Sequence, residues 1–366
     1  MVTIGSRKYV PLSMGVLVPG MNINHSVYYQ KNGMYVLLCK DVVLNEELID
    51  KLKDIAIREK NIYVPQDKRD AMIEESRLFR KVEIEVFEGY DEIKGESKEL
   101  FNNIAQTDTV CRETTAEILN TIDDKLEKVD HSVIIQSINQ IREVDEYLHT
   151  HSVNVSLLNG MIGKWKKLDE ESVSDLIEVG LYHDIGKIRI SPEILNKPAK
   201  LTDEEFAEIK RHSTYSYEML DKSLSEVSER VKEGVLQHHE KVNGSGYPNR
   251  LVGDAICEFA RITAVSDVYD AMVARRTYKE AHSPFTILAW FSDGRFSELD
   301  IEYVNLFLEC MVSELRGKNV LMSDGSIAEV IYVNPQNYEY PIVKIGDTVM
   351  TTSSDLYVVR MYTEQG

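Results

Sequence analysis

The chain has 366 residues, of which 43% are hydrophobic, enough for a buried core and for more than one domain. Lysine and arginine number 42 against 61 aspartate and glutamate residues, which gives a net charge of −19 at pH 7. A chain this acidic is a poor candidate for nonspecific binding to long nucleic acid or to an anionic membrane, so an anionic ligand would need a locally positive site.

The first part of the chain, 1–65, is expected to form a small module of strands and one helix. Two runs of β-branched and aromatic residues flank Asn32-Gly33, a dipeptide typical of a tight hairpin turn. A short helix is expected at 45–57 and a further strand at 61–64.

The remaining chain divides into three parts. Residues 66–130 are charged with scattered apolar positions, and we expect connecting helices there. The pattern is helical almost throughout 131–316, whereas 317–366 reverts to short strands with a hairpin signal at Asp324-Gly325. The predicted fold is therefore mainly α: an all-helical domain flanked by a small α+β N-terminal module and a short β-rich C-terminal extension.

Histidines cluster in the helical domain, where six of the nine fall between 149 and 239. His151 lies in an apolar stripe with Val155, Leu158 and Ile162, at spacings of three and four residues that form one helical face. An imidazole in such a stripe is predicted to point inward.

Two further helices carry histidines. One is predicted to begin with a capping box at Ser172 and ends in His183-Asp184. The next is predicted to begin with a capping box at Thr202 and to carry His212 in its interior.

The last two helices of interest follow. One has Val231, Val235, His238 and His239 at i, i+4, i+7 and i+8, so both histidines continue its buried stripe. In the other, Asp267 lies on a strip of small residues, where a bulky group could approach.

Buried imidazoles and carboxylates are costly unless they are paired or bind a metal. A single histidine of this kind is more often an ordinary core or surface residue, but seven such groups together are not. The set is His151, His183, Asp184, His212, His238, His239 and Asp267. We treat the remaining histidines as ordinary residues: His25, His131, His149 and His282.

Five imidazoles and two carboxylates are too many ligands for one first-row metal ion, but they suit two ions with one carboxylate bridging. Nitrogen and oxygen ligands without thiolate favour iron, manganese or another first-row divalent ion. Two ions about 3.5–4 Å apart can clamp a phosphate and lower the pKa of water toward about 7. The residues alone therefore predict metal-dependent phosphoester hydrolysis.

The motifs resemble a known family. "HDIGK" at 183–187, "HHEKVNGSGYP" at 238–248 and "SDVYDAMVARRTYK" at 266–279 are similar to the HD-GYP branch of the HD phosphohydrolase superfamily, over roughly 131–290. The resemblance implies an HD-type domain in 131–316 that hydrolyses cyclic di-GMP to pGpG or GMP by a metal-bridging hydroxide. It also implies two divalent metal ions, iron more readily than manganese.

The resemblance assigns each ligand to one of the two metals. The first would take His151, His183, Asp184 and Asp267, and the second would take Asp184, His212, His238 and His239. Trinuclear members of the family have a glutamate where this chain has Tyr147, so we predict a binuclear centre.

The resemblance also implies substrate contacts. Lys187 would contact the scissile phosphate as part of the catalytic machinery, and Arg276 and Lys279 would bind the phosphates of the dinucleotide. Tyr247 would offer an aromatic surface at the rim, on a loop that the glycines within 244–246 allow to turn tightly.

There are two alternatives to hydrolysis of cyclic di-GMP: a related phosphohydrolase that acts on another cyclic dinucleotide, and a catalytically silent receptor for cyclic di-GMP. The retention of all seven predicted ligands argues against a silent receptor. The flanking modules could serve regulation, dimerisation or packing, and the long helices expected within 95–165 suggest a homodimer.

The cellular location is predicted from features that the sequence lacks. The four cysteines are far apart and form no CxxC pair, which is typical of free thiols in a reducing compartment. The N-terminus lacks the pattern of a signal peptide, and no stretch approaches the roughly 18 apolar residues of a membrane span. We expect a cytoplasmic protein without membrane insertion.

Overall fold

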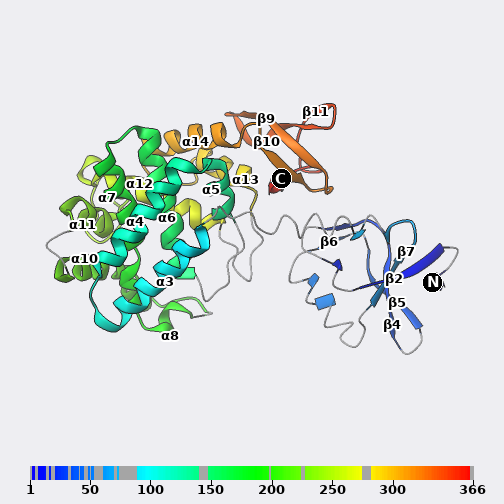
Figure 1. Cartoon of the computed structure of the whole chain (residues 1–366), viewed down its shortest axis with the longest axis horizontal. Helices are drawn as coiled ribbons and strands as arrows, with labels where there is room; N and C mark the ends of the chain where they lie inside the picture. Colours follow the sequence, from blue (N-terminus) through cyan, green and yellow to red (C-terminus); the bar gives the residue numbers. More distant parts are fainter. Residues whose placement is uncertain are drawn as a thin grey trace. The chain divides into compact units, whose positions relative to one another are not determined.

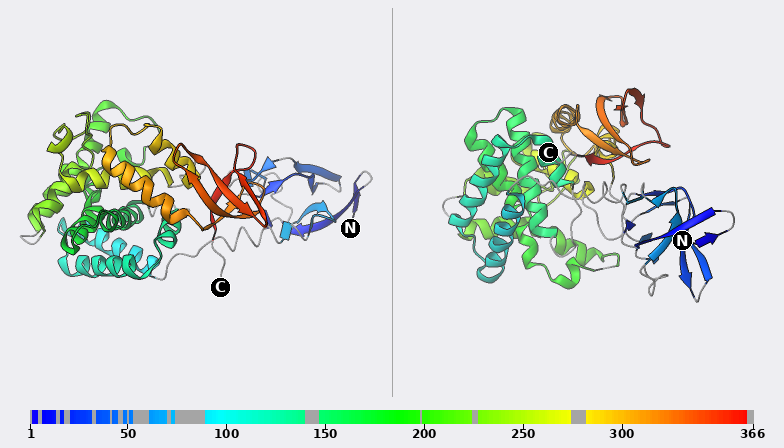
Figure 2. Two further views of the ribbon diagram at one scale, coloured as in Figure 1. Left: turned by 90° about the horizontal axis from the view of Figure 1, so that it is seen from above. Right: turned by 45° about the vertical axis from the view of Figure 1, so that its right-hand side comes forward.

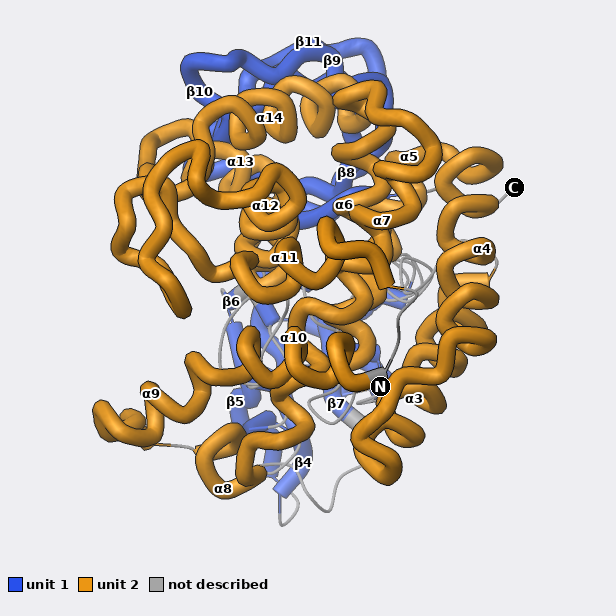
Figure 3. The backbone as a smooth tube through the Cα atoms, turned by 90° about the vertical axis from the view of Figure 1, so that its left-hand side faces the viewer, with its two compact units in different colours: residues 1–85, 316–366 blue, residues 86–315 orange. Residues whose placement is uncertain are grey.

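The computed structural model forms two compact units, coloured separately in Figure 3: one of residues 86–315, and one of residues 1–85 together with 316–366. Each unit is described by itself. The structure describes residues 2–4, 7–13, 16–17, 21–31, 34–40, 42–44, 48–49, 51–52, 61–69, 72–73, 89–139, 147–197, 199–223, 227–273 and 282–362.

The unit 86–315 is helical, as the sequence predicts (Figure 1). Its elements are α3 (Tyr90–Thr107), α4 (Arg112–Lys128), α5 (His131–Ile138), α6 (Tyr147–Lys166), α7 (Glu170–Tyr182), η3 (Ile185–Arg189), α8 (Pro192–Leu195), α9 (Asp203–Lys210), α10 (His212–Ser223), α11 (Glu229–Gln237), η4 (Gly253–Ala255), α12 (Glu258–Val273), α13 (Pro284–Ser292) and α14 (Ile301–Leu315). Among the described helices, none combines the length and hydrophobicity needed to cross a membrane.

Helix α6 is the centre of this unit. All of its residues from His151 to Gly163 are buried, because α3, α4, α7, α12 and α14 surround it. Its closest neighbour is α7, where a Cβ at Gly180 would lie 2.6 Å from the backbone nitrogen of Ser156. Glycine at this position therefore lets the backbones of α6 and α7 come together, which brings His151 near the end of α7.

The helix boundaries confirm one predicted start and correct another. The Thr202 side chain accepts a hydrogen bond from the Glu205 N–H, and the Glu205 carboxylate accepts one from the Thr202 N–H, so this capping box is confirmed. The box predicted at Ser172 is wrong, because Asp169 caps α7 and accepts from the Ser172 N–H. A carboxylate placed three residues earlier satisfies that end of the helix.

The placement of His212 inside the helix that begins after Thr202 is also wrong. Helix α9 ends at Lys210, and His212 is the first residue of a new helix, α10. The sequence shows no sign of the break, because no proline or glycine separates the two helices.

The N-terminal sheet has five strands in the order β1-β2-β7-β4-β5, all paired antiparallel. Strands β3 and β6 from the same part of the chain form a separate antiparallel pair. The strands are β1 (Val2–Ile4), β2 (Arg7–Ser13), β3 (Asn22–Ile23), β4 (Val27–Lys31), β5 (Met34–Cys39), β6 (Val42–Val43) and β7 (Asn61–Pro65). The predicted hairpin is confirmed by the pairing of Lys31 with Met34, although its turn residues lie outside the described part. Most of the helix expected at 45–57 also lies outside it.

The C-terminal strands form a second antiparallel sheet in the order β11-β10-β9-β8-β12, orange to red in Figure 2. They are β8 (Asn319–Met322), β9 (Ile327–Asn334), β10 (Asn337–Ile345), β11 (Thr348–Thr351) and β12 (Val358–Tyr362). The hairpin predicted at Asp324-Gly325 joins β8 to β9, and Gly325 has φ +86°, the left-handed conformation that glycine adopts readily.

Candidate metal centre

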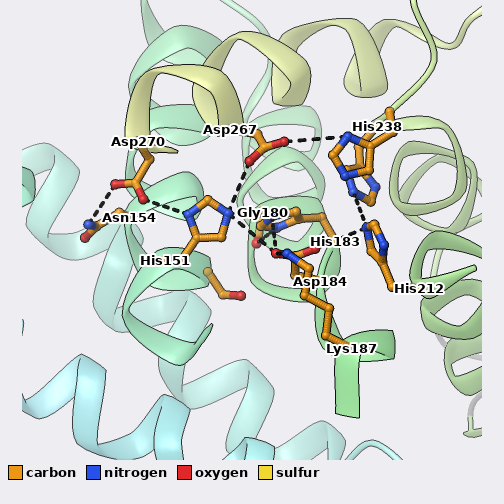
Figure 4. A network of polar contacts seen from close by, with 12 residues as sticks. His151, Asn154, Gly180, His183, Asp184, Lys187, His212, His238, Asp267 and Asp270 are labelled. Carbon is orange, nitrogen blue, oxygen red and sulfur yellow. Dashed lines mark hydrogen bonds and ion pairs between the residues drawn. The ribbon is translucent and has the colours of Figure 1, made fainter. Parts of the chain in front are cut away.

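Side chains from five parts of the helical unit converge on one point (Figure 4). They come from α6, from the end of α7, from the start of α10, from the residues after α11, and from α12. The structure brings together all seven residues singled out in the sequence: His151, His183, Asp184, His212, His238, His239 and Asp267. Five of them are at most 1% exposed, and the two that are partly exposed, His239 and Asp267, lie at the rim.

The seven side chains form two groups. One contains His151, His183 and Asp267, and the other contains Asp184, His212, His238 and His239. Within each group the candidate ligand atoms lie within 4.8 Å of one another, close enough for a single ion to contact all of them.

Asp184 lies between the two groups (Figure 4). Its Oδ2 is 3.5 Å from His183 Nε2 and 3.6 Å from His151 Nε2, whereas its Oδ1 is 3.3 Å from His212 Nε2. Oδ1 is buried and accepts no hydrogen bond from any residue in the described part of the chain. A buried carboxylate oxygen without a donor is costly, and a bound cation would satisfy it.

Three histidines are oriented by the backbone of the helix that precedes them. In His183, His212 and His238 the ring Nδ1 lies 2.7, 2.6 and 2.6 Å from the carbonyl oxygen three residues earlier. Each of these carbonyls is in the last turn of its helix, where carbonyls lack intrahelical N–H partners. Since a carbonyl can only accept, Nδ1 carries the proton in each ring and donates it.

The consequence is that the Nε2 atoms face the centre with free lone pairs. Nε2 of His212 and Nε2 of His238 are 3.2 Å apart. Burial lowers the pKa of both rings, that of His238 well below its usual value, so both are neutral at pH 7 and neither Nε2 carries a proton. Two facing acceptors repel unless a cation lies between or beside them, which fits a metal site.

The first group repeats this arrangement. Nε2 of His151 is 3.2 Å from Nε2 of His183 and 3.2 Å from Asp267 Oδ1. The other carboxylate oxygen of Asp267 lies 3.8 Å from His239 Nδ1 in the second group. Burial lowers the pKa of His239 to about 3, against the opposing effect of the Asp267 carboxylate.

Both carboxylates of the centre are ionised. Burial alone would raise the pKa of Asp184, but the positive charge of Lys187 outweighs it and holds this pKa well below its usual range. Lys187 forms an ion pair with Asp184 Oδ2. Burial likewise opposes the lowered pKa of Asp267, which the neighbouring imidazoles of His151 and His239 hold well below its usual range.

The short η3 helix that follows Asp184 is locked against α10. The Gly186 N–H donates to Ser216 Oγ at 2.8 Å, and the Ser216 hydroxyl donates to the His183 carbonyl at 3.0 Å. A Cβ at Gly186 would lie 2.5 Å from the Ser216 nitrogen and would also collide with the His212 carbonyl. The glycine of HDIGK is therefore required for the contact that places His212 beside Asp184.

Glu240, quoted in the sequence motif but given no role there, braces the loop after His239. Its carboxylate is buried and accepts from the Asn249 N–H at 2.6 Å and from the Leu251 N–H at 2.9 Å. The loop of residues 241–251 is thus held by a buried side chain that accepts from two of its backbone N–H groups.

The glycines of this loop act as the sequence predicts. Gly244 has φ +77°, and a Cβ at Gly246 would lie 2.5 Å from Glu240 Cα. The tight turn brings the Tyr247 ring to 4.8 Å, centroid to centroid, from the ring of His239.

Sequence reasoning missed two residues behind His151. Its Nδ1–H donates to Asp270 Oδ2 at 2.7 Å, and Asn154 Nδ2 donates to Asp270 Oδ1 at 2.9 Å (Figure 4). Their spacing in the sequence could have identified both, because Asp270 follows Asp267 by one helical turn and Asn154 follows His151 by one turn. Such outer partners fix the tautomer and orientation of a metal-binding histidine.

Three predictions fall beyond what the structure describes. Arg276 and Lys279 lie outside the described residues. Tyr147 begins α6, but its side chain is not among those described, so the argument for a binuclear centre stays a prediction.

Comparison with known proteins supports the same site. A family model described as "HD domain" matches residues 113–295, half of the chain, and this span contains every ligand candidate.

Three relatives are named phosphodiesterases. A cyclic di-GMP phosphodiesterase of Pseudomonas aeruginosa is 32% identical over 215 residues, 59% of this chain and 51% of that protein. The cyclic di-GMP phosphodiesterase response regulator RpfG of Xanthomonas campestris is 38% identical over 165 residues, 45% of this chain and 42% of that protein. A 3'3'-cGAMP-specific phosphodiesterase of Vibrio cholerae is 40% identical over 140 residues, 38% of this chain and 27% of that protein.

The chain spans about half the length of the first of these relatives and less of the other two. The span that the family model matches lies within the helical unit and includes its clustered histidines and carboxylates. This chain belongs to the HD domain family, and its HDIGK and GYP motifs are those of the HD-GYP branch.

Proposed function

We propose that this chain is a metal-dependent phosphodiesterase that hydrolyses cyclic di-GMP to pGpG or GMP. The observation that carries the proposal is the pair of ligand groups joined by Asp184, with two histidine Nε2 atoms facing each other across 3.2 Å in each group. Relatives named for cyclic di-GMP at 32–38% identity supply the substrate class.

The centre is proposed to hold two divalent ions, iron more readily than manganese. His151, His183 and Asp267 would hold one, His212, His238 and His239 the other, and Asp184 would bridge them. When bound, such ions supply a water of lowered pKa and a positive site for the phosphate. A nitrogen-rich ligand set without cysteine suits these metals.

The remaining roles belong to this chain's own side chains. Lys187 adds a positive charge beside Asp184, and we assign it to the phosphate that is cleaved. Tyr247 presents a partly exposed ring next to His239 and is assigned to the substrate at the rim. Arg276 and Lys279 keep their predicted contacts with the phosphates of the dinucleotide.

The test is hydrolysis of cyclic di-GMP by the full chain purified without air. Asp184→Ala removes the bridging carboxylate and should abolish turnover, a loss of at least about 10³-fold if both metals are needed. Asp254→Asn is the matched control, because that carboxylate is fully exposed, and it should leave turnover unchanged. Tight binding of cyclic di-GMP without turnover, under iron or manganese, would instead identify a silent receptor.

A second substrate is favoured by one finding: relatives of Vibrio cholerae that are 32–40% identical are named 3'3'-cGAMP-specific phosphodiesterases. The two substrates differ in one base only, and the phosphodiester chemistry is the same. Comparing kcat/KM for cyclic di-GMP and 3'3'-cGAMP on one preparation separates them. The homodimer and the cytoplasmic location expected from the sequence stay predictions.

A further inference from the structure

A line of buried hydrogen bonds leads from His151 to the first residue of α3. His151 Nδ1 donates to one oxygen of Asp270, Asn154 donates to the other, and the carbonyl oxygen of Asn154 accepts from the Tyr90 hydroxyl. All four side chains are at most 2% exposed, so water does not substitute for any of these partners.

The chemistry of the groups fixes the direction of every bond in the line. A carboxylate only accepts, so Asn154 must turn its NH2 group toward Asp270 and its carbonyl oxygen toward Tyr90. The Tyr90 hydroxyl must then be the donor. Rotating the Asn154 amide by 180° would place an N–H2 against the hydroxyl and two acceptors against each other at Asp270.

Tyr90 comes from a part of the chain that the family match does not include. The matched residues begin at 113, whereas Tyr90 opens α3 (Tyr90–Thr107), which packs against α6. The hydroxyl that completes this line is therefore contributed by a helix that lies before the matched HD region.

We propose that Tyr90 and Asn154 are positioning residues for the metal centre. Together they hold Asp270 so that its carboxylate keeps the proton on His151 Nδ1 and aims His151 Nε2 at the ligand group. The proposal rests on the proposed role of His151 as a metal ligand.

The expected loss of metal affinity is smaller for a substitution that lies further from His151 along the line of hydrogen bonds. Outer partners of a ligating histidine typically change metal affinity by about 10–100-fold. Asn154→Ala removes a direct partner of Asp270 and should weaken the affinity of the His151 site by about 10-fold. Tyr90→Phe acts one step further out and should weaken it by about 3-fold or more.

The experiment titrates Mn(II) into the metal-free full chain and follows it by electron paramagnetic resonance, with no nucleotide present. The variants are Tyr90→Phe, Asn154→Ala and the double variant. At limiting Mn(II), both single variants should show more signal of isolated Mn(II) and less of the coupled pair than the wild type. Because Asn154→Ala already breaks the line, adding Tyr90→Phe to it should change nothing further.

The matched control is Tyr303→Phe. Tyr303 is also 2% exposed, and its hydroxyl donates to Glu258 at 2.9 Å in the same unit. This control also loses the hydrogen bond of a buried tyrosine hydroxyl and should bind Mn(II) like the wild type, which separates positioning from general stability. Thermal unfolding of the metal-free proteins checks folding, and Asn154→Ala alone carries the comparison if Tyr90→Phe does not fold.

The outcomes are distinct. Mn(II) binding by Tyr90→Phe and Asn154→Ala that matches the wild type, or a Tyr90→Phe effect that persists in the Asn154→Ala background, would overturn the positioning role. A wild-type chain that binds no Mn(II) would overturn both this role and the metal centre. A chain that binds two Mn(II) ions but hydrolyses no cyclic dinucleotide would overturn the proposed function alone.

Discussion

In each fully buried histidine of the candidate centre, Nδ1 forms a hydrogen bond to the protein and Nε2 faces the other candidate ligands. The sequence identified His183 at the end of a predicted helix, His212 inside a predicted helix and His238 in an apolar stripe. It could not identify the carbonyls that fix their tautomers, because those contacts depend on where each helix stops. Residue type and spacing thus predicted the ligands, and helix termination determines their orientation.

The first prediction concerns pH and the metal-free protein. Burial holds the pKa of His212 and His238 below the ordinary value near 6.5, so the unfolded chain takes up these protons first as pH falls. The stability contributed by the neutral rings is complete above about pH 6.5 and decreases below it. Between pH 7.5 and 5.5 the free energy of unfolding should therefore fall, by up to about 1.4 kcal/mol per ring.

Urea unfolding at the two pH values, with a chelator present, measures this loss. His238→Gln removes one of the two titrating rings, so its loss should be smaller, by up to about 1.4 kcal/mol. An undiminished loss in this variant would show that His238 does not contribute to the pH dependence.

At the scale of elements, short segments place the ligands as much as the long helices do. The five-residue η3 helix and the loop 241–251 each depend on glycines that allow close backbone contact. The sequence indicated the loop through its Gly-Tyr-Pro, but it did not show that η3 packs on α10. Contacts between segments that are far apart in sequence leave no periodic pattern.

Gly186→Ala tests that contact. The new methyl group would collide with backbone atoms of α10, so the variant should lose about 1–3 kcal/mol of stability and bind metal more weakly because His212 is displaced. Gly95→Ala on α3 is the control, since a Cβ there meets no described atom within 4 Å, and it should be neutral or stabilising by up to about 1 kcal/mol. Equal unfolding midpoints for the two variants would contradict the packing argument.

Glu240→Gln tests the brace of the loop. An amide offers one acceptor oxygen, so one of the two backbone N–H groups of Asn249 and Leu251 would face an NH2 group. We expect a loss of about 2–3 kcal/mol in urea unfolding and faster proteolysis within 241–251. Glu233→Gln, exposed on α11, should change neither, and an intact loop in Glu240→Gln would refute the brace.

For the whole molecule, the sequence predicted a mainly helical chain with strands at both ends, and the structure agrees. It divided the chain at 131, because the charged segment before that position was interpreted as a linker. The compact unit instead begins at 86, since α3 and α4 bury apolar residues against α6. Charged residues on the outer faces of these helices concealed this role from composition alone.

This division predicts how fragments behave. Residues 86–315 should unfold cooperatively and bind the same number of metal ions as the full chain, because all seven ligand candidates lie within them. Residues 131–315 should be unstable, because removing α3 and α4 exposes the face of α6 that they cover and takes away buried core residues of α4 such as Ile118 and Ile122. Circular dichroism and metal analysis of both fragments provide the comparison, and a stable 131–315 fragment would contradict it.

The central claim is that hydrolysis depends on two metal ions joined by Asp184. The most direct measurement is turnover of cyclic di-GMP while Fe(II) or Mn(II) is added stepwise to the metal-free full chain without air. The account predicts little turnover until the first equivalent is bound, and a rise that reaches its plateau at two equivalents per chain. Full turnover at one equivalent, or a plateau only at three, would contradict the binuclear centre.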